Sequence, residues 1–248
     1  MKEGVDTAKF ITVFKRYEKK YMLSLEQYDA LRKVLDEHMH VDKYGRSLIQ
    51  NIYYDTPDFY LIRASIEKPL YKEKLRARCY GECTDEHNTF VEIKKKYDKV
   101  VYKRRVSMEY NQAVAYLAGE APPPKTTQIT NEIDWFFKIY KGLAPAMYVS
   151  YERIAMASKE NSGLRITFDQ NITYRNYDLD LRKGCYGDKL IGEDCYLMEI
   201  KIPGAMPIWL ARTLEELKIY PISYSKYGNA YRTLFQKKVI TIGGQTNA

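Results

Sequence analysis

Cationic side chains recur at every second position along several segments of this chain. Lys74, Arg76 and Arg78 alternate with apolar residues, so an extended backbone directs all three to one face. Arginine forks and lysine amines grouped in this way bind anions, and the fork of arginine matches pairs of phosphate oxygens. The chemistry that this spacing predicts is the binding of a polyanion.

The same alternation returns in other strand-like segments, often with one carboxylate among the cations. The further sets are Arg16, Glu18 and Lys20; Glu92, Lys94 and Lys96; Lys103 and Arg105; Tyr151 and Arg153; Arg165, Thr167 and Asp169; and Glu199 and Lys201. For a single strand, the solvent-exposed face of an antiparallel sheet is the simpler interpretation. Repetition over many strands favours a closed barrel with charges inside and helices outside. Crowded like charges are costly unless an anion lies among them, which predicts a polyphosphate-sized ligand.

The elements that position these side chains are strands with a few amphipathic helices between them. Ser24 and Gln27 form a capping-box pattern that begins a helix over 25–40. Further helices are expected near 109–118, 130–141, 206–219 and 227–236. The proline-rich segment 121–124 interrupts regular structure, and we interpret it as an internal loop. We therefore expect an α+β fold in one domain over 1–248, with a core of about 10–236 and a short C-terminal tail.

Composition limits the class of protein. The chain has 248 residues, a formal net charge of +8 and a pI near 9.0, which favours anionic partners. A charged fraction of 29% with 45% hydrophobic residues excludes a disordered polyelectrolyte and a membrane bundle. The sequence contains no run of roughly 18 apolar residues and no signal-like start, so we expect a cytoplasmic protein.

Eight short segments in a fixed order match a known family. They are Arg-Tyr-Glu-Lys-Lys-Tyr at 16–21, Tyr-Tyr-Asp-Thr at 53–56, Lys-Leu-Arg-Ala-Arg at 74–78, Glu-Ile-Lys at 92–94, Tyr-Glu-Arg at 151–153, Leu-Arg-Ile-Thr-Phe-Asp at 164–169, Met-Glu-Ile-Lys at 198–201 and Ser-Lys-Tyr at 225–227. Over about residues 10 to 236 the chain resembles the catalytic domain of the vacuolar transporter chaperone (VTC) polyphosphate polymerases, in the triphosphate tunnel metalloenzyme (CYTH-like) superfamily. The resemblance implies an eight-stranded antiparallel β-tunnel with flanking helices.

The resemblance also implies roles for individual residues. Lys226, Arg76, Arg78 and Arg153 are expected to be catalytic, and Glu199 is expected to bind a divalent metal, Mn²⁺ or Mg²⁺. The phosphate-binding set comprises Lys20, Lys74, Arg76, Arg78, Lys94, Lys103, Arg105, Tyr151, Arg153, Arg165, Lys201, Ser225 and Lys226. Spacing alone leaves open whether Lys103 or Arg105 faces the tunnel.

The implied function is transfer of the ATP γ-phosphate to a growing polyphosphate chain. The wider superfamily begins with Glu-x-Glu-x-Lys, whereas this chain has Arg16 at the first position, which favours the polymerase branch over adenylate cyclases and thiamine triphosphatases. An inorganic or nucleoside triphosphatase of the same fold and a non-catalytic polyphosphate-binding module remain alternatives.

The expected partners are ATP, triphosphate and polyphosphate. Nucleic acid is not expected, because no motif aligns aromatic side chains for base stacking. Fungal members of the family carry an N-terminal regulatory domain and C-terminal membrane helices, and this sequence shows neither. Coupling to a membrane would then need a separate membrane partner.

Overall fold

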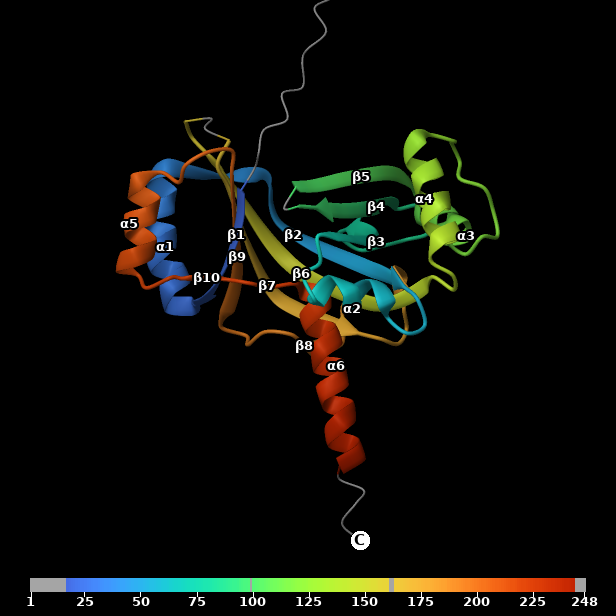
Figure 1. Ribbon diagram of the computed structural model, residues 1–248. Helices are drawn as coiled ribbons and strands as arrows, with labels where there is room; N and C mark the ends of the chain where they lie inside the picture. Colours follow the sequence, from blue (N-terminus) through green and yellow to red (C-terminus); the bar gives the residue numbers. More distant parts are fainter. Residues whose placement is uncertain (1–16, 99, 161–162, 244–248) are drawn as a thin grey trace, which may run out of the picture.

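An antiparallel sheet with helices on its outer side organises the chain (Figure 1). The computed structural model describes residues 17–98, 100–160 and 163–243, with side chains as far as Phe235. The predicted strand residue Arg16 lies outside the described residues. In chain order the elements are β1 (Tyr17–Ser24), α1 (Leu25–His38), β2 (Met39–Asp55), α2 (Tyr60–Ile66), β3 (Tyr71–Tyr80), β4 (Asn88–Tyr97), β5 (Val100–Glu109), α3 (Tyr110–Leu117), α4 (Gln128–Ile139), β6 (Ala144–Ser158), β7 (Arg165–Arg175), the short 3-10 turn η1 (Leu181–Lys183), β8 (Asp188–Lys189), β9 (Cys195–Ile202), α5 (Ile208–Glu216), β10 (Pro221–Ile222) and α6 (Lys226–Gly243).

The expected α+β class is confirmed, but the strand count differs. The strand order is β10-β1-β9-β7-β6-β2-β3-β4-β5, with β8 paired to β7, so the sheet has ten strands where eight were expected. The additional strands, β8 and β10, have two residues each, and no alternation can reveal so short a strand. Within the described residues, β5 and β10 each pair with one neighbour. The sheet therefore curls without closing through main-chain hydrogen bonds, unlike the closed barrel that we expected.

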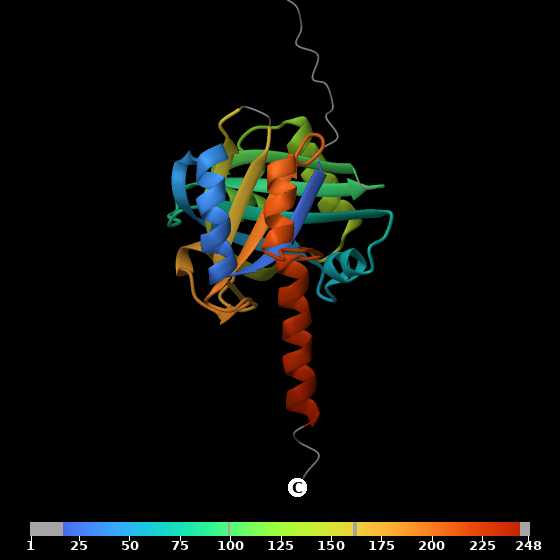
Figure 2. The same ribbon diagram turned by 90° about the vertical axis from the view of Figure 1, so that its left-hand side faces the viewer.

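The apolar faces of β1, β7 and β9 pack against α1 and α5. Figure 2 shows these two helices in front of the strands. The cluster between the layers comprises Tyr21, Leu23, Leu31, Leu35, Met39, Met156, Leu164, Ile166, Phe168, Met198, Ile200, Ile202, Leu210, Leu214 and Ile219. Because alternate residues of each strand are committed to this layer, the charged residues between them must face the other way.

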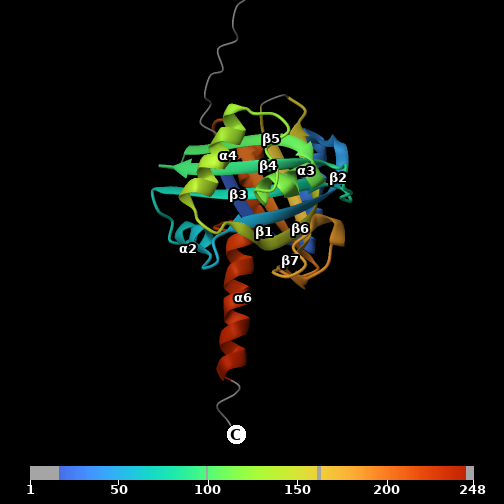
Figure 3. The ribbon, with the colours of Figure 1, turned by 90° about the vertical axis from the view of Figure 1, so that its right-hand side faces the viewer.

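The apolar faces of β3 and β4 are covered in the same manner by α3 and α4 (Figure 3). Leu75 and Ala77 of β3 and Ile93 of β4 are buried there, together with Ile133 and Phe136 of α4. Both halves of the sheet thus place their apolar side outward under helices. The predicted arrangement of apolar outside and charge inside is present in both.

The predicted helices are present with shifted ends, and one helix was not predicted. The capping box of Ser24 and Gln27 begins α1, which ends at His38 because Met39 already belongs to β2. Helix α2 was not predicted, because its first turn is capped by the buried carboxylate of Asp55, which lies outside the helix. Asp55 accepts hydrogen bonds from the backbone N–H groups of Leu61 and Ile62, at 2.8 and 3.0 Å.

Helix α6 is longer than the predicted 227–236 and projects away from the sheet (Figure 1). Its start is fixed by Ser225, whose Oγ accepts a hydrogen bond of 3.1 Å from the backbone N–H of Gly228. Over the described part of the chain, none of the helices combines the length and apolar character needed to span a bilayer.

Candidate functional site

The charged faces of the strands line the inner side of the curled sheet. Lys94 of β4 lies close enough to Glu18 and Lys20 of β1 for their charges to shift its pKa, although β1 and β4 are far apart in the strand order. Only a rolled sheet brings these strands together. We call the enclosed space the basic tunnel, and its charged lining comprises Glu18, Lys20, Lys74, Arg76, Arg78, Glu92, Lys94, Lys103, Arg153, Asp169, Glu199, Lys201 and Lys226.

Glu92 gathers three cations on the β3 to β5 side of the tunnel. Its Oε2 lies 2.6 Å from an Arg76 Nη2 and 3.9 Å from Arg78 Nε, and its Oε1 lies 2.6 Å from Lys103 Nζ. Burial alone would raise the pKa of Glu92, but the charges of Arg76, Arg78 and Lys103 outweigh it and lower the pKa to about 2. The carboxylate is therefore ionised at neutral pH and orients the cations around it.

Side chains from β2 and β6 also hold Arg76 and Arg78 in place through hydrogen bonds. Arg76 donates to the Tyr53 hydroxyl at 3.2 Å, while Arg78 donates to Asn51 Oδ1 at 2.8 Å and to the Tyr151 hydroxyl at 3.2 Å. A guanidinium held at several nitrogens has little freedom left, which prepares it to bind a pair of anionic oxygens.

Asp169 organises a second set of cations that joins β6, β7 and α6. Arg153 donates two hydrogen bonds to its carboxylate, at 2.6 and 2.7 Å, and Lys226 Nζ lies 2.5 Å from Oδ2. These charges outweigh burial and hold the pKa of Asp169 far below its ordinary value. Lys226 lies 57 positions from Asp169 in the sequence, and its place at the start of α6 directs it into the tunnel.

Glu199 forms the third carboxylate centre of the tunnel. It is ion-paired with Lys201, and it lies opposite Lys20 in the pairing of β1 with β9. Burial would raise the pKa of Glu199, but the charges of Lys201 and Lys20 outweigh it and lower the pKa to about 2. On β7, Thr167 pairs with Glu199, and its buried hydroxyl has no hydrogen-bond partner among the described residues.

The residues around Glu199 could hold a metal ion only if a bound substrate supplied the remaining ligands. Within residues 17–98, 100–160 and 163–243, no group of three histidine, cysteine or acidic side chains could hold a metal ion. Mg²⁺ commonly uses one or two carboxylates together with phosphate oxygens and water. Glu199 can supply such a carboxylate, with phosphate oxygens completing the set.

Two lysines of the tunnel have no carboxylate partner in the described part of the chain. Lys74 donates to the Ser225 hydroxyl at 3.2 Å, and burial, followed by the nearby Lys94 and Lys72, lowers its pKa to about 8 despite the opposing effect of Tyr53. Lys94 is exposed, yet burial is the largest cause that lowers its pKa. A side chain that lines a hollow keeps accessible surface while protein atoms surround and desolvate it. Lys94 combines these two properties.

The cations of the tunnel differ in depth. The side chain of Lys103 is 40% exposed and that of Lys20 26%, whereas Arg78 is 7% and Lys226 11% exposed. Beneath the less exposed group lies an apolar cluster that includes Tyr53, Tyr151, Ile172, Leu197 and Tyr227. The tunnel therefore has an accessible outer part near Lys103 and Lys20. Its less accessible part, near Arg78 and Lys226 at the start of α6, is the deep end of the tunnel.

Two predicted phosphate-binding residues form no ion pair with the carboxylate centres in the described part of the chain, although Arg105 lies opposite Glu92 in the strand register. Arg165 is exposed and pairs with Lys201 near the strand end, and Arg105 is exposed with its guanidinium 4.7 Å from the centre of the Phe90 ring. Lys103 and Arg105 share the inner face, so spacing could not separate them, but Lys103 is the one that contacts Glu92.

Sequence reasoning did not assign site roles to several residues that shape the tunnel. Glu92 and Asp169 were placed on the charged faces, but their cation partners depend on strand register. Asn51 and Tyr53 were missed as supports for the arginines, because a contact between β2 and β3 leaves no pattern in either strand alone.

Comparison with known proteins identifies the family. The family described as VTC domain matches residues 15–235. The chain belongs to the VTC domain family. No curated protein matches it.

Solved structures share the fold of this VTC domain at low identity. A candidate adenylate cyclase from Bacillus halodurans is 16% identical, with a TM-score of 0.50, over 84% of this chain and 92% of that chain. A structure from Hippeastrum, described as a candidate adenylyl cyclase with a dominant triphosphatase activity, is 14% identical, with a TM-score of 0.47, over 85% of this chain and 92% of that chain. At such identities the likeness concerns the fold.

Proposed function

We propose that this VTC domain is a polyphosphate polymerase that transfers the γ-phosphoryl group of ATP to the end of a growing polyphosphate chain. Family membership and the excess of cations in the basic tunnel support this proposal. Phosphoryl transfer requires that the charges of the phosphates be neutralised while the attacking and leaving oxygens stay in line. Cations fixed on opposite walls of a tunnel meet both requirements.

The main support for the proposal is that each inner carboxylate is paired with cations that lower its pKa. The pKa values of Glu92 and Glu199 are lowered to about 2, and that of Asp169 is lowered further. A carboxylate with so low a pKa is a poor general base, and water needs a base before it attacks. The terminal oxygen of a phosphate chain is already anionic, so the tunnel suits a phosphate acceptor better than water.

The roles of the residues follow from their partners. Lys74 and Lys94 bind an incoming phosphate without giving up an ion pair. Arg76, Arg78 and Arg153 hold the transferring group from fixed positions, and Lys226 contacts it from the deep end. The remaining phosphate contacts come from Lys20, Lys103, Arg105, Tyr151, Arg165, Lys201 and Ser225.

Glu199 would hold Mn²⁺ or Mg²⁺ together with phosphate oxygens. Such an ion, when bound, would act as a Lewis acid that neutralises phosphate charge. Lys201 and Lys20 keep Glu199 ionised and therefore ready to act as a ligand.

Triphosphate hydrolysis is the second candidate function, and one residue favours it. Burial would raise the pKa of Tyr151, but the charges of Arg78, Arg153 and Lys226 outweigh it and lower the pKa to about 8. Like the amine of Lys74, a phenol with this pKa is close in strength to a base that could activate water at neutral pH. An anion bound beside Tyr151 raises its pKa again and keeps the phenol protonated, which favours transfer to phosphate.

The deciding experiment incubates the purified protein with ATP and Mn²⁺ and separates the phosphate products by size. The proposal expects polymer, and Lys226→Ala should reduce chain formation more than it reduces ATP binding. Orthophosphate as the only product, with a short polyphosphate primer supplied, assigns the tunnel to hydrolysis. Binding of polyphosphate without any turnover assigns it to a binding module.

A further inference from the structure

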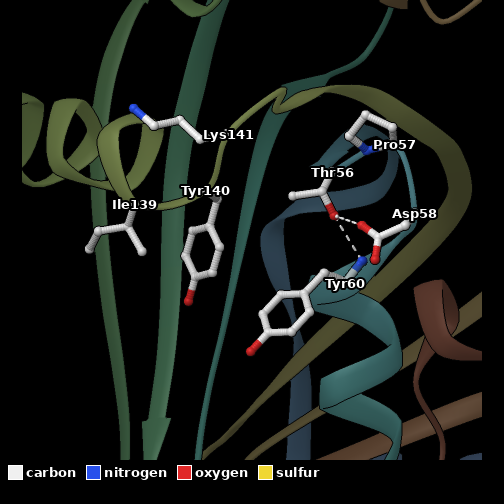
Figure 4. A pocket seen from close by; sticks show the side chains of 7 residues that line it. All are labelled: Thr56, Pro57, Asp58, Tyr60, Ile139, Tyr140 and Lys141. Atoms are coloured by element: carbon white, nitrogen blue, oxygen red, sulfur yellow. Dashed lines mark hydrogen bonds between the residues drawn. The ribbon is translucent and has the colours of Figure 1, made fainter.

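A pocket outside the basic tunnel lies between the start of α2 and the end of α4 (Figure 4). Its volume is about 540 Å³, within the range of pockets that bind small molecules or bulky side chains. The lining residues are Thr56, Pro57, Asp58, Tyr60, Ile139, Tyr140 and Lys141. None of them belongs to the charged lining of the tunnel.

Exposed apolar side chains of α4 continue the surface of this pocket. Trp135 is 62% exposed and Ile139, one helical turn later, is 61% exposed. Elsewhere on the same helix, Ile133 and Phe136 are buried against the sheet. Packing of the domain therefore does not account for Trp135 and Ile139. Contiguous exposed apolar surface that includes aromatic residues is typical of protein interfaces.

The charge at the rim of the pocket is positive. Lys138 and Lys141 have no carboxylate within ion-pair distance in the described part of the chain, and Lys138 Nζ lies 5.3 Å from the centre of the Trp135 ring. Asp58, by contrast, is paired with Arg63 at 3.2 Å. The uncompensated charge beside the apolar surface thus comes from the two lysines.

We propose that this surface docks an acidic, amphipathic segment of a partner protein. A bulky apolar side chain of the segment enters the pocket beside Ile139 and Tyr60, and its carboxylates pair with Lys138 and Lys141. Charge complementarity selects this occupant, because two lysines beside exposed apolar side chains match carboxylates that flank an apolar residue, whereas a polyphosphate chain would need more cations and has no apolar group for the pocket. The proposal does not depend on the reaction in the tunnel.

The test selects phage-displayed random 12-residue peptides on the immobilised full chain. The most enriched peptides are synthesised and titrated by fluorescence anisotropy against the wild type, Ile139→Ser, Lys141→Glu and a control, Lys33→Glu, which changes an exposed lysine of α1. Thermal melting verifies that each variant is folded, and Trp135→Ser replaces Ile139→Ser if the latter is not. Sedimentation of the wild type and Ile139→Ser measures self-association.

The expected peptides carry a bulky apolar residue flanked by Asp or Glu. Their affinity should fall at least tenfold in Ile139→Ser and Lys141→Glu and stay unchanged in Lys33→Glu. Absence of enriched peptides, enrichment of basic peptides, or equal binding by all variants overturns the proposal. A wild-type dimer that Ile139→Ser abolishes also overturns it, because the surface then belongs to a second copy of the chain.

Discussion

The hydroxyl of Tyr227 donates a hydrogen bond of 2.8 Å to Oδ2 of the buried Asp55. The same carboxylate accepts the N–H groups that begin α2, so it ties the first turn of α6 to α2. Ser225 and Lys226, which reach into the tunnel, directly precede Tyr227. Asp55 is therefore a positioning residue for both.

Tyr227→Phe removes this bond and leaves the cap of α2 in place. We expect the free energy of unfolding to fall by about 1–3 kcal/mol, the cost of leaving a buried charged acceptor short of one donor. Turnover should fall with little change in KM for ATP, because Lys226 loses its fixed position. Denaturant unfolding and steady-state kinetics measure the two effects. Tyr231→Phe, also on α6, is the control, and an equal loss there would contradict the positioning role.

Lys94→Met should weaken triphosphate binding and stabilise the free protein. Lys94 lacks a carboxylate partner and lies near Lys20 and Arg76, so its removal relieves repulsion. We expect a loss of affinity of about 1.5 kcal/mol or more, the scale of a charge-assisted hydrogen bond. Calorimetry with tripolyphosphate measures the affinity, and Lys33→Met is the control. Unchanged affinity would remove Lys94 from the phosphate-binding set.

Glu92→Gln should destabilise the free protein, because Arg76, Arg78 and Lys103 then crowd together without their shared carboxylate. Loss of one partner from a buried ion pair costs about 3–5 kcal/mol. Triphosphate should restore much of this stability by taking the place of the carboxylate. Melting curves with and without tripolyphosphate provide the check, and a ligand-induced shift no larger than that of the wild type would speak against the prediction.

Glu199→Gln should retain nucleotide binding and lose metal-dependent turnover. An amide is a poorer ligand than a carboxylate for a hard cation. We expect the Mn²⁺ concentration for half-maximal activity to rise at least tenfold, measured by metal titration of the rate. Wild-type metal dependence in this variant would return Glu199 to a purely structural pairing with Lys201.

Triphosphate affinity should fall as the pH rises from 7 to 9. The pKa of Lys74 is about 8, so the amine loses its positive charge in this interval. The pKa of Tyr151 is also about 8, so its phenol gains a negative charge there. Both changes oppose anion binding. Calorimetry across the pH range tests this, and Lys74→Arg with Tyr151→Phe should flatten the profile. A flat wild-type profile would refute it.

Alternation along the strands was sufficient to predict the inner face of the charged residues that the structure describes. Lys74, Arg76 and Arg78 lie on the inner face as predicted, because a strand has only two faces. Depth was not predictable: Arg105 and Arg165 share the inner face yet are exposed, since depth depends on how far each strand extends past its neighbours. Long-range pairings such as Tyr227 with Asp55 were likewise hidden, because they depend on how α6 and α2 dock.

The diameter of the tunnel depends on the edges of β5 and β10, which pair with no further strand among the described residues. In a closed barrel, strand number and stagger fix the diameter through main-chain hydrogen bonds. In the described part of this chain no such bonds join the two edges, so their separation depends on side-chain packing and side-chain charge. Repulsion among the lysines favours a wider gap, and a polyanion bound as proposed above would draw the walls together. Such a substrate would bridge the two edges of the sheet and complete the ring around itself.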